Sequence, residues 1–245
     1  MKDTLVEIRD FTMRFGDTTV IDTLSFDVKR GETFGLLGSN GSGKTTIIRA
    51  LLGIYQPTSG SLTIGGLPYS VDGPIRLGYL PEERGLYKKE KVIDIMTYFG
   101  RLKGMSAPAA RIWSETFLAD VDLADKRDTR LDKLSGGQQQ KVQLGITIIN
   151  NPELLILDEP TKGFDPVNRR LLMSIIEKHQ KAGATVIFVT HQMEEVERLC
   201  DRIILLKDGA AHAYGTVRQV KRKFGGGSLD DIFVRIYGDS TKEES

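Results

Sequence analysis

Cysteine, long apolar runs and an excess of either charge are scarce or missing in this sequence. Cys200 is the only cysteine, which excludes an internal disulfide and any zinc or iron–sulfur site built from cysteines, and which suits a reducing compartment. No apolar run approaches the roughly 20 residues that a membrane-spanning helix needs, and the start, Met1 to Thr4, lacks the apolar core of a signal peptide. We therefore expect a soluble chain that depends on a partner for any function at a membrane.

The charges of the chain are nearly balanced. The 34 basic and 33 acidic residues leave a net charge of +1, so no overall field favours nucleic acid or an acidic membrane surface. The 245 residues, 40% of them hydrophobic, suffice for a core and suit one domain or one domain with a subdomain. No internal repeat is apparent. We expect no nucleic-acid partner.

The most informative segment is a glycine-rich loop between a short apolar strand and an apolar helix, the context in which the pattern G-x-x-x-x-G-K-[ST] has meaning. The loop and the start of the helix comprise Gly38, Ser39, Asn40, Gly41, Ser42, Gly43, Lys44, Thr45 and Thr46. Glycines let successive N–H groups point inward, and the positive end of the helix completes an anion cradle. We expect Lys44 to reach the outer phosphates of a nucleoside triphosphate and Thr45 to bind Mg²⁺. The alternative is a flexible surface loop with a chance lysine.

A second candidate anion site precedes a helix that we expect over about 139–149. It comprises Leu134, Ser135, Gly136, Gly137 and Gln138. A serine and two glycines at a helix start expose N–H groups that suit an anion. The same residues also fit an ordinary N-cap with loop glycines, so the local pattern leaves both interpretations open.

Two carboxylates end a strand that is apolar throughout. Residues 154–157 are typical of a strand buried on both faces in a parallel sheet, and Asp158 and Glu159 follow. Because α/β proteins bind ligands at the carboxyl ends of such strands, we expect Asp158 to hold Mg²⁺ through water and Glu159 to take a proton from an attacking water. A solvated acidic turn is the alternative. His191 follows the apolar strand 186–190 in the same kind of position.

The surrounding pattern predicts an α/β fold. Short alternating runs before residue 34 indicate an antiparallel β layer, and the later apolar strands indicate a mostly parallel sheet with flanking helices, the core of a P-loop NTPase. Helical periodicity predicts an inserted helical subdomain over about 86–150, with Ile112, Phe117 and Leu118 on one face. We expect one domain over 1–215 and a short C-terminal extension over 216–245.

Taken in this order, the motifs resemble those of the nucleotide-binding subunit of an ATP-binding cassette (ABC) transporter. The resemblance covers nearly the whole chain: Walker A at 38–45, the signature at 134–138, Walker B at 154–159, the D-loop at 163–166 and a switch histidine at 191. It implies an ATPase that uses Mg²⁺, with Lys44, Glu159 and His191 in catalysis. It also implies that Phe15 stacks on adenine and that Val20 lies beside the base. Without the resemblance, the local sequence shows only that Phe15 is an aromatic residue just before a glycine turn.

In this family two subunits face each other head to tail, which implies that each ATP lies between the phosphate loop of one copy and the signature of the other. The implied partners are separate transmembrane permease subunits and a second ABC subunit, identical or related. The implied location is the cytoplasmic face of the cell membrane.

One position departs from the family. Glu82 stands where the Q-loop has a glutamine that touches Mg²⁺; a carboxylate can still approach the metal, but it adds negative charge. Residues 81–87 and 228–233 resemble the ABC-2 type exporter subfamily, which includes sodium-extrusion and drug-resistance ATPases.

Two other functions compete with a transporter subunit. A soluble ABC-type ATPase that acts on nucleic acid or ribosomes would carry coiled coils, a zinc module or a second cassette, and this sequence has none of these. A regulatory module that binds ATP without hydrolysing it would not need Glu159 and His191, and both are present.

Overall fold

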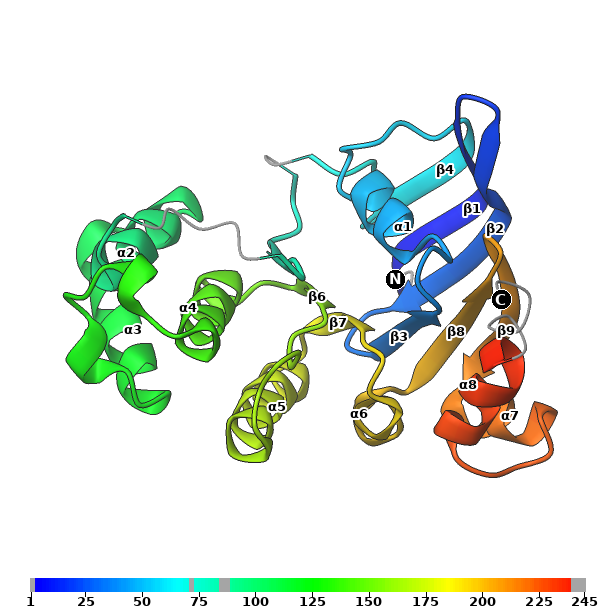
Figure 1. The fold of residues 1–245 in the computed structure, drawn as a ribbon. Helices are drawn as coiled ribbons and strands as arrows, with labels where there is room; N and C mark the ends of the chain where they lie inside the picture. Colours follow the sequence, from blue (N-terminus) through cyan, green and yellow to red (C-terminus); the bar gives the residue numbers. More distant parts are fainter. Residues whose placement is uncertain (1–2, 71–72, 84–88, 239–245) are drawn as a thin grey trace. The chain divides into compact units, whose positions relative to one another are not determined.

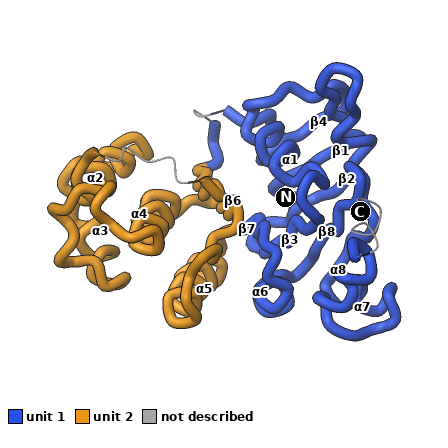
Figure 2. Tube along the Cα trace, in the orientation of Figure 1, with its two compact units in different colours: residues 1–75, 185–245 blue, residues 76–184 orange. Residues whose placement is uncertain are grey.

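The computed structural model describes residues 3–70, 73–83 and 89–238 (Figure 1). The chain forms two compact units, which Figure 2 shows in different colours. Unit 1 combines residues 1–75 with 185–245, and unit 2 consists of residues 76–184. Unit 1 is therefore built from two stretches that are far apart in the sequence.

Unit 1 contains the antiparallel layer and the strands that lead into the phosphate loop. Its strands are β1 (Thr4–Phe15), β2 (Thr18–Lys29), β3 (Thr33–Gly38), β4 (Ser59–Ile64), β7 (Thr185–Val189), β8 (Arg202–Lys207) and β9 (Ala210–Thr216). Its helices are α1 (Lys44–Leu51), α6 (Met193–Leu199), α7 (Val217–Lys223) and α8 (Leu229–Tyr237). β1 pairs antiparallel with β2 and β4. β3 lies between β7 and β8 and runs parallel to both, while β9 returns antiparallel to β8.

The sequence explains the central position of β3 and the extent of β1. Every residue of β3 is buried, as expected of a strand flanked by parallel neighbours. β1 continues to Phe15, beyond the short alternating run, because register shifts accommodate residues such as Asp10, which has a φ of +46°. The predicted α/β class and the antiparallel layer are confirmed.

Unit 2 contains the inserted helices and the strand that ends in two carboxylates. It comprises β5 (Leu77–Leu80), α2 (Val92–Leu102), α3 (Ala107–Asp120), α4 (Gly136–Ile148), β6 (Leu154–Asp158) and α5 (Pro166–Lys181), with short 3₁₀ turns at Ala124–Lys126 and Leu131–Lys133. β5 pairs parallel with β6, and all five residues of β6 are buried. The predicted helical insertion is therefore present.

One prediction about the helical insertion is wrong. Ile112 is 65% exposed, whereas Phe117 and Leu118 are buried. Successive residues of a helix are about 100° apart around its axis. Ile112 is five residues before Phe117, so the two side chains lie on different faces of the helix. Trp113, four residues before Phe117, stacks on it instead, with ring centroids 5.2 Å apart.

The two histidines besides His191 lie on α5 and β9. His179, on α5, is half-buried, and burial lowers its pKa. His212, on β9, is exposed, and its ring stacks on Phe224 with centroids 5.8 Å apart.

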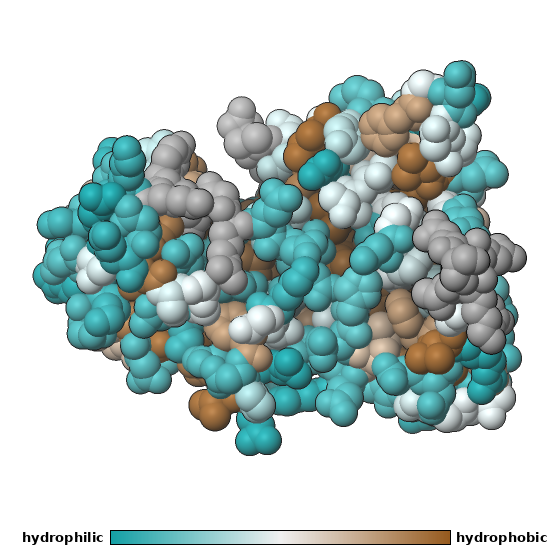
Figure 3. All heavy atoms as spheres, in the orientation of Figure 1, coloured by the Kyte–Doolittle hydropathy of each residue, from teal (hydrophilic) through white to brown (hydrophobic). Residues whose placement is uncertain are grey.

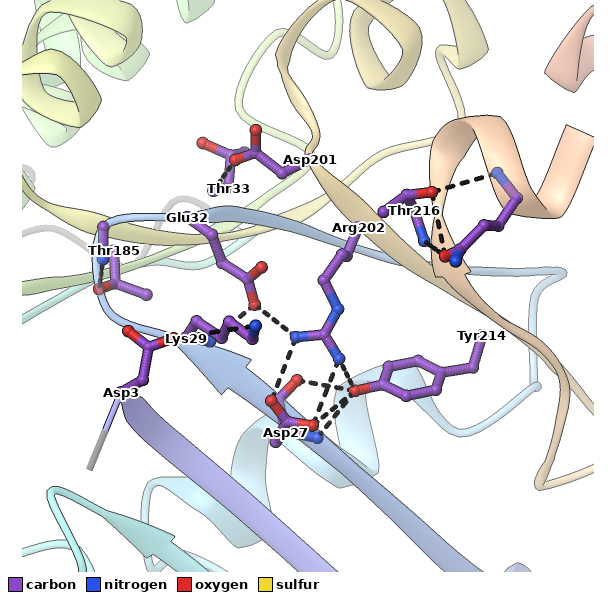
Figure 4. A network of polar contacts seen from close by, with 12 residues as sticks. Asp3, Asp27, Lys29, Glu32, Thr33, Thr185, Asp201, Arg202, Tyr214 and Thr216 are labelled. Atoms are coloured by element: carbon purple, nitrogen blue, oxygen red, sulfur yellow. Dashed lines mark hydrogen bonds and ion pairs between the residues drawn. The ribbon is translucent and has the colours of Figure 1, made fainter.

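A polar network links the two sheets of unit 1 (Figure 4). The Arg202 guanidinium on β8 donates to Asp27 Oδ2 on β2 and to Glu32 Oε1, each at 3.1 Å. Tyr214 on β9 donates its hydroxyl to Asp27 Oδ1 at 2.8 Å, and the guanidinium lies 4.8 Å from the centre of its ring. Burial raises the pKa of Glu32 although Arg202 lowers it. One cation thus compensates two carboxylates, one of them almost buried.

Replacing this cation should destabilise the fold. We expect Arg202→Met to lower the free energy of unfolding by about 3 kcal/mol at neutral pH, because two carboxylates then lose their partner. Loss of Arg202 raises the folded pKa of Glu32 further, so the deficit should grow as the pH rises above the unfolded pKa and shrink as it falls below it. Urea titrations at pH 7 and pH 4 measure both effects. Arg218→Met, on an exposed position of α7, is the matched control, and equal midpoints for the two variants would contradict the role of the network.

Candidate functional site

The phosphate loop of unit 1 joins β3 to α1 and is shaped by two glycines without room for a side chain. A Cβ atom on Gly38 would lie 2.7 Å from the Leu206 carbonyl oxygen, and one on Gly43 would lie 2.3 Å from Ile21 Cδ1. Gly43 also has a φ of +100°, a conformation that other residues rarely adopt. The loop backbone is therefore packed directly against β8 and β2.

The polar groups of the loop suit an anion. α1 begins at Lys44, so the N–H groups of its first turn have no acceptor within the helix. Lys44 Nζ donates to the carbonyl oxygens of Gly38 and Ser39, both at 2.8 Å. The Ser42 hydroxyl is buried and has no hydrogen-bond partner among the described residues. Ser39 and Thr46 are half-buried, and the exposed members of the loop are Asn40, Gly41 and Thr45.

The residues expected beside the base lie in unit 1 as well. Phe15, the last residue of β1, is 45% exposed, and its ring meets that of Tyr55 edge-on at a centroid distance of 5.2 Å. Val20 on β2 is half-buried, next to the Ile21 that packs on Gly43. An exposed phenylalanine costs free energy in water, so a planar ligand that covers it would be favoured. No motif or periodicity in the sequence indicates a role for Tyr55.

His191 lies two residues beyond the end of β7 and is exposed. Its ring centroid lies 6.3 Å from that of Phe233, and the two ring planes are nearly perpendicular, at 85°. Phe233 belongs to α8 and follows His191 by more than 40 residues in the chain. The sequence did not indicate this contact.

In unit 2, the signature residues form the start of α4. Ser135 is the N-cap: its hydroxyl accepts from the Gln138 N–H at 3.3 Å, and Gln138 Oε1 accepts from the Ser135 N–H at 2.9 Å. This reciprocal capping box lets the helix begin at Gly136, three residues before the expected start. Gly136 and Gly137 therefore lie in the first turn, where N–H groups can bind an anion. A Cβ atom on Gly137 would lie 3.4 Å from the Phe164 ring.

The two carboxylates at the end of β6 are buried, and the second has an unusual backbone conformation. Asp158 is 6% exposed and Glu159 is 7% exposed. Glu159 has a φ of +49°, in the left-handed region that a glutamate seldom occupies. The buried Gln140 amide of α4 donates to the carbonyl oxygens of Glu159 at 3.4 Å and Pro160 at 3.0 Å. The signature helix thus holds the peptide that bears Glu159, and such strain is concentrated at functional sites.

The departure at Glu82 has a counterpart in the structure. Lys162, three residues after Glu159, forms an ion pair with Glu82, with Nζ and Oε1 2.5 Å apart. The Glu82 hydrogen bond and charge raise the pKa of Lys162. The charge that a carboxylate adds in place of glutamine is therefore balanced locally by a lysine. Both side chains are exposed, so the pair contributes little to stability.

The expected metal donors suit Mg²⁺ bound with a triphosphate. Glu82 and Asp158 belong to unit 2 and Thr45 belongs to unit 1. Within residues 3–70, 73–83 and 89–238, no group of three or more His, Cys, Asp or Glu side chains could hold a metal ion. Mg²⁺ usually takes one or two carboxylates and completes its shell with phosphate oxygens and water, so these residues fit the ion only together with a nucleotide.

The described part of the chain contains no membrane-spanning helix. No helix there is both long enough and apolar enough to cross a bilayer. The face drawn in Figure 3 is mostly hydrophilic, with hydrophobic residues in scattered groups. The subfamily cue at 81–87 can be followed only to Glu83, since residues 84–87 lie outside the described part.

The chain is similar to known proteins over most of its length. Residues 21–162 match the family model of the ABC transporter. An uncharacterised ABC transporter ATP-binding protein of Methanocaldococcus jannaschii is 43% identical, over 89% of this chain and 80% of that protein. The Nod factor export ATP-binding protein I of Burkholderia lata is 38% identical, over 86% of this chain and 70% of that protein.

A solved structure shares the fold. It is described as the ATP-binding subunit of an ABC transporter, has a TM-score of 0.87 and 30% sequence identity, and the match covers 95% of this chain and 99% of the other. The family model covers more than half of the chain, and the relatives exceed 30% identity over most of their length. The chain belongs to the ABC transporter family as an ATP-binding subunit, and it is an ATPase.

Proposed function

We propose that this chain powers an ABC-2 type exporter through ATP-driven closure of a head-to-tail dimer and hydrolysis-driven opening. The buried pair Asp158 and Glu159 carries this proposal, because a strained, buried glutamate at the end of β6 is costly unless it serves chemistry. The relative from Burkholderia lata is named for export, which supports the direction of transport. We propose that residues 1–215 act as the nucleotide-binding domain, with a helical subdomain over about 86–150, and that 216–245 form an extension.

In this mechanism the phosphate loop binds the triphosphate. The amides of 38–46 and Lys44 stabilise the negative charge, while Phe15 and Val20 flank the adenine. Lys44 exchanges its two loop carbonyl contacts for phosphate oxygens when the nucleotide arrives. An ammonium already held at the loop needs little reorganisation, which lowers the cost of binding.

Hydrolysis requires a base and a metal. Glu159 accepts a proton from the attacking water, and Gln140 keeps the peptide of Glu159 in place. Thr45, Asp158 and Glu82 would hold Mg²⁺, and the ion would neutralise charge on the phosphate oxygens. Lys162 keeps the carboxylate of Glu82 from adding an uncompensated charge.

Two copies of the chain share each ATP in this proposal. The start of α4, with Ser135, Gly136, Gly137 and Gln138, binds the γ-phosphate held by the partner copy, and His191 donates to the same phosphate. Cleavage removes the group that bridges the copies, so the dimer opens. A separate permease, bound at the cytoplasmic face of the membrane, follows this motion.

A phosphate-release assay on the purified chain tests the ATPase role in this proposal. We expect Mg²⁺-dependent release of phosphate from ATP, abolished by EDTA and by Lys44→Ala. The presence of bound ATP without any phosphate release, with or without a permease, would indicate a regulatory module instead.

A further inference from the structure

Within unit 1, helix α8 is held by hydrogen bonds to other elements at both of its ends. At its start, Ser228 and Asp231 form a capping box, and the Leu229 N–H donates to Glu197 Oε1 on α6 at 2.6 Å. At its end, Lys207 Nζ on β8 donates to the Ile236 carbonyl oxygen at 3.0 Å. These contacts on two different elements fix the position of the helix relative to α6 and β8.

The last residue of α8 connects it to the phosphate loop. The buried Tyr237 hydroxyl donates to the Leu206 carbonyl oxygen at 2.7 Å. Leu206 is the β8 residue that pairs with Gly38, the first glycine of the loop. Burial, with a smaller effect of Asp208, raises the pKa of Tyr237 to about 12, so the hydroxyl keeps the proton that it donates at neutral pH.

The same helix reaches His191 through a second aromatic ring. Phe233 lies one helical turn before Tyr237, and their ring centroids are 4.3 Å apart. Phe233 also meets the His191 ring, with centroids 6.3 Å apart and the planes at 85°. Perpendicular aromatic contacts of this kind are favourable. Two adjacent rings therefore span from the strand beside Gly38 to the histidine.

We propose that α8 positions His191 for the γ-phosphate: Phe233 restricts the imidazole, and Tyr237 fixes Phe233 relative to the strand next to the phosphate loop. This inference rests on the proposed role of His191. Phe233 and Tyr237 are positioning residues, since they act through the histidine and the loop. The C-terminal extension thereby becomes part of the device that distinguishes ATP from ADP.

The physical basis is the cost of ordering an exposed side chain. His191 is exposed, and its contact with the Phe233 ring limits the rotamers of the imidazole, so less side-chain entropy is lost when a phosphate binds. An aromatic contact shifts such a population by about 2- to 10-fold. Because His191 is proposed to touch only the γ-phosphate, this gain should appear in the affinity for ATP and not in that for ADP.

The test compares ATP and ADP affinities in the full chain with Mg²⁺, in a Glu159→Gln background that prevents turnover. We expect Phe233→Ala to weaken ATP binding about 2- to 10-fold and to leave ADP binding unchanged. Phe233→Leu, which keeps an apolar side chain without the ring, should act in the same way, whereas Phe233→Tyr should bind like the parent. Val234→Ala, at the 61% exposed neighbouring position, is the matched control and should change neither affinity.

A double-mutant comparison separates this inference from the proposed function. Phe233→Ala should add nothing to the loss caused by His191→Ala. If His191→Ala weakens ATP binding while both Phe233→Ala and Phe233→Leu leave the ATP-to-ADP ratio unchanged, the positioning role is wrong and the switch role stands. Equal weakening of ATP and ADP would also overturn it, because that is a general effect on the fold. If His191→Ala itself changes nothing, the proposed role of His191 fails and this inference fails with it.

Discussion

Replacing Glu159 by glutamine should lower ATP turnover by about 10²–10⁴-fold, the usual size of a general-base effect, while ATP binding persists. Glutamine has nearly the same shape and can adopt the same backbone conformation, but its amide cannot accept a proton. The peptide hydrogen bonds from Gln140 do not involve the carboxylate, so they should survive the substitution. Phosphate release under saturating ATP measures turnover, and equilibrium binding of ATP measures retention.

Glu153→Gln provides the matched control for this experiment. Glu153 directly precedes β6, at the opposite end of the strand from Glu159, and it forms a long ion pair of 3.8 Å with Arg76. The chemical change is identical, and we expect turnover close to that of the parent. Unchanged turnover in Glu159→Gln would remove this residue from the mechanism.

Mixing two inactive variants should restore activity. Lys44→Ala disables the phosphate loop, and Gly137→Asp places a carboxylate at the start of α4, where it repels phosphate and crowds the Phe164 ring, 3.4 Å from the position of a Cβ. In a head-to-tail pair with one copy of each, one of the two sites has both parts intact. Random pairing of the copies then predicts roughly one quarter of the parent rate, if the sites work independently.

The control for the mixture uses a chain that carries both substitutions. Combined with Lys44→Ala, this chain leaves no site with an intact phosphate loop, and we expect no gain. Phosphate release at several mixing ratios gives the comparison. If the mixture of Lys44→Ala and Gly137→Asp never exceeds the separate variants, the two binding surfaces do not serve one nucleotide and the head-to-tail proposal is wrong.

The sequence predicted the parts of the fold that depend on local pattern. β3, β6 and β7 are buried throughout and each contains a run of mainly apolar residues, so a single sequence suffices to recognise them. Helix starts depend on the capping residues. α5 begins at Pro166, because Asp165 caps it and proline suits the first turn. Likewise, the capping box at Ser135 overrides the poor helix propensity of two glycines.

The contacts that the sequence did not predict join residues far apart in the chain. Glu82 pairs with Lys162, Gln140 holds the peptide of Glu159, and Phe233 meets His191. Periodicity and motif spacing do not show how far apart such residues lie in the folded protein. The left-handed backbone of Glu159 could not be predicted from the sequence either. The residues before Pro160 do not form a turn motif that would indicate a positive φ at Glu159.

Sedimentation velocity of the Glu159→Gln chain is the most direct test of the central claim, that ATP joins two copies and its cleavage separates them. With Mg²⁺ and ATP we predict a dimer, and with Mg²⁺ and ADP a monomer, because ADP lacks the phosphate that the second copy binds. A chain that binds ATP and yet sediments identically with ATP and with ADP would contradict the account.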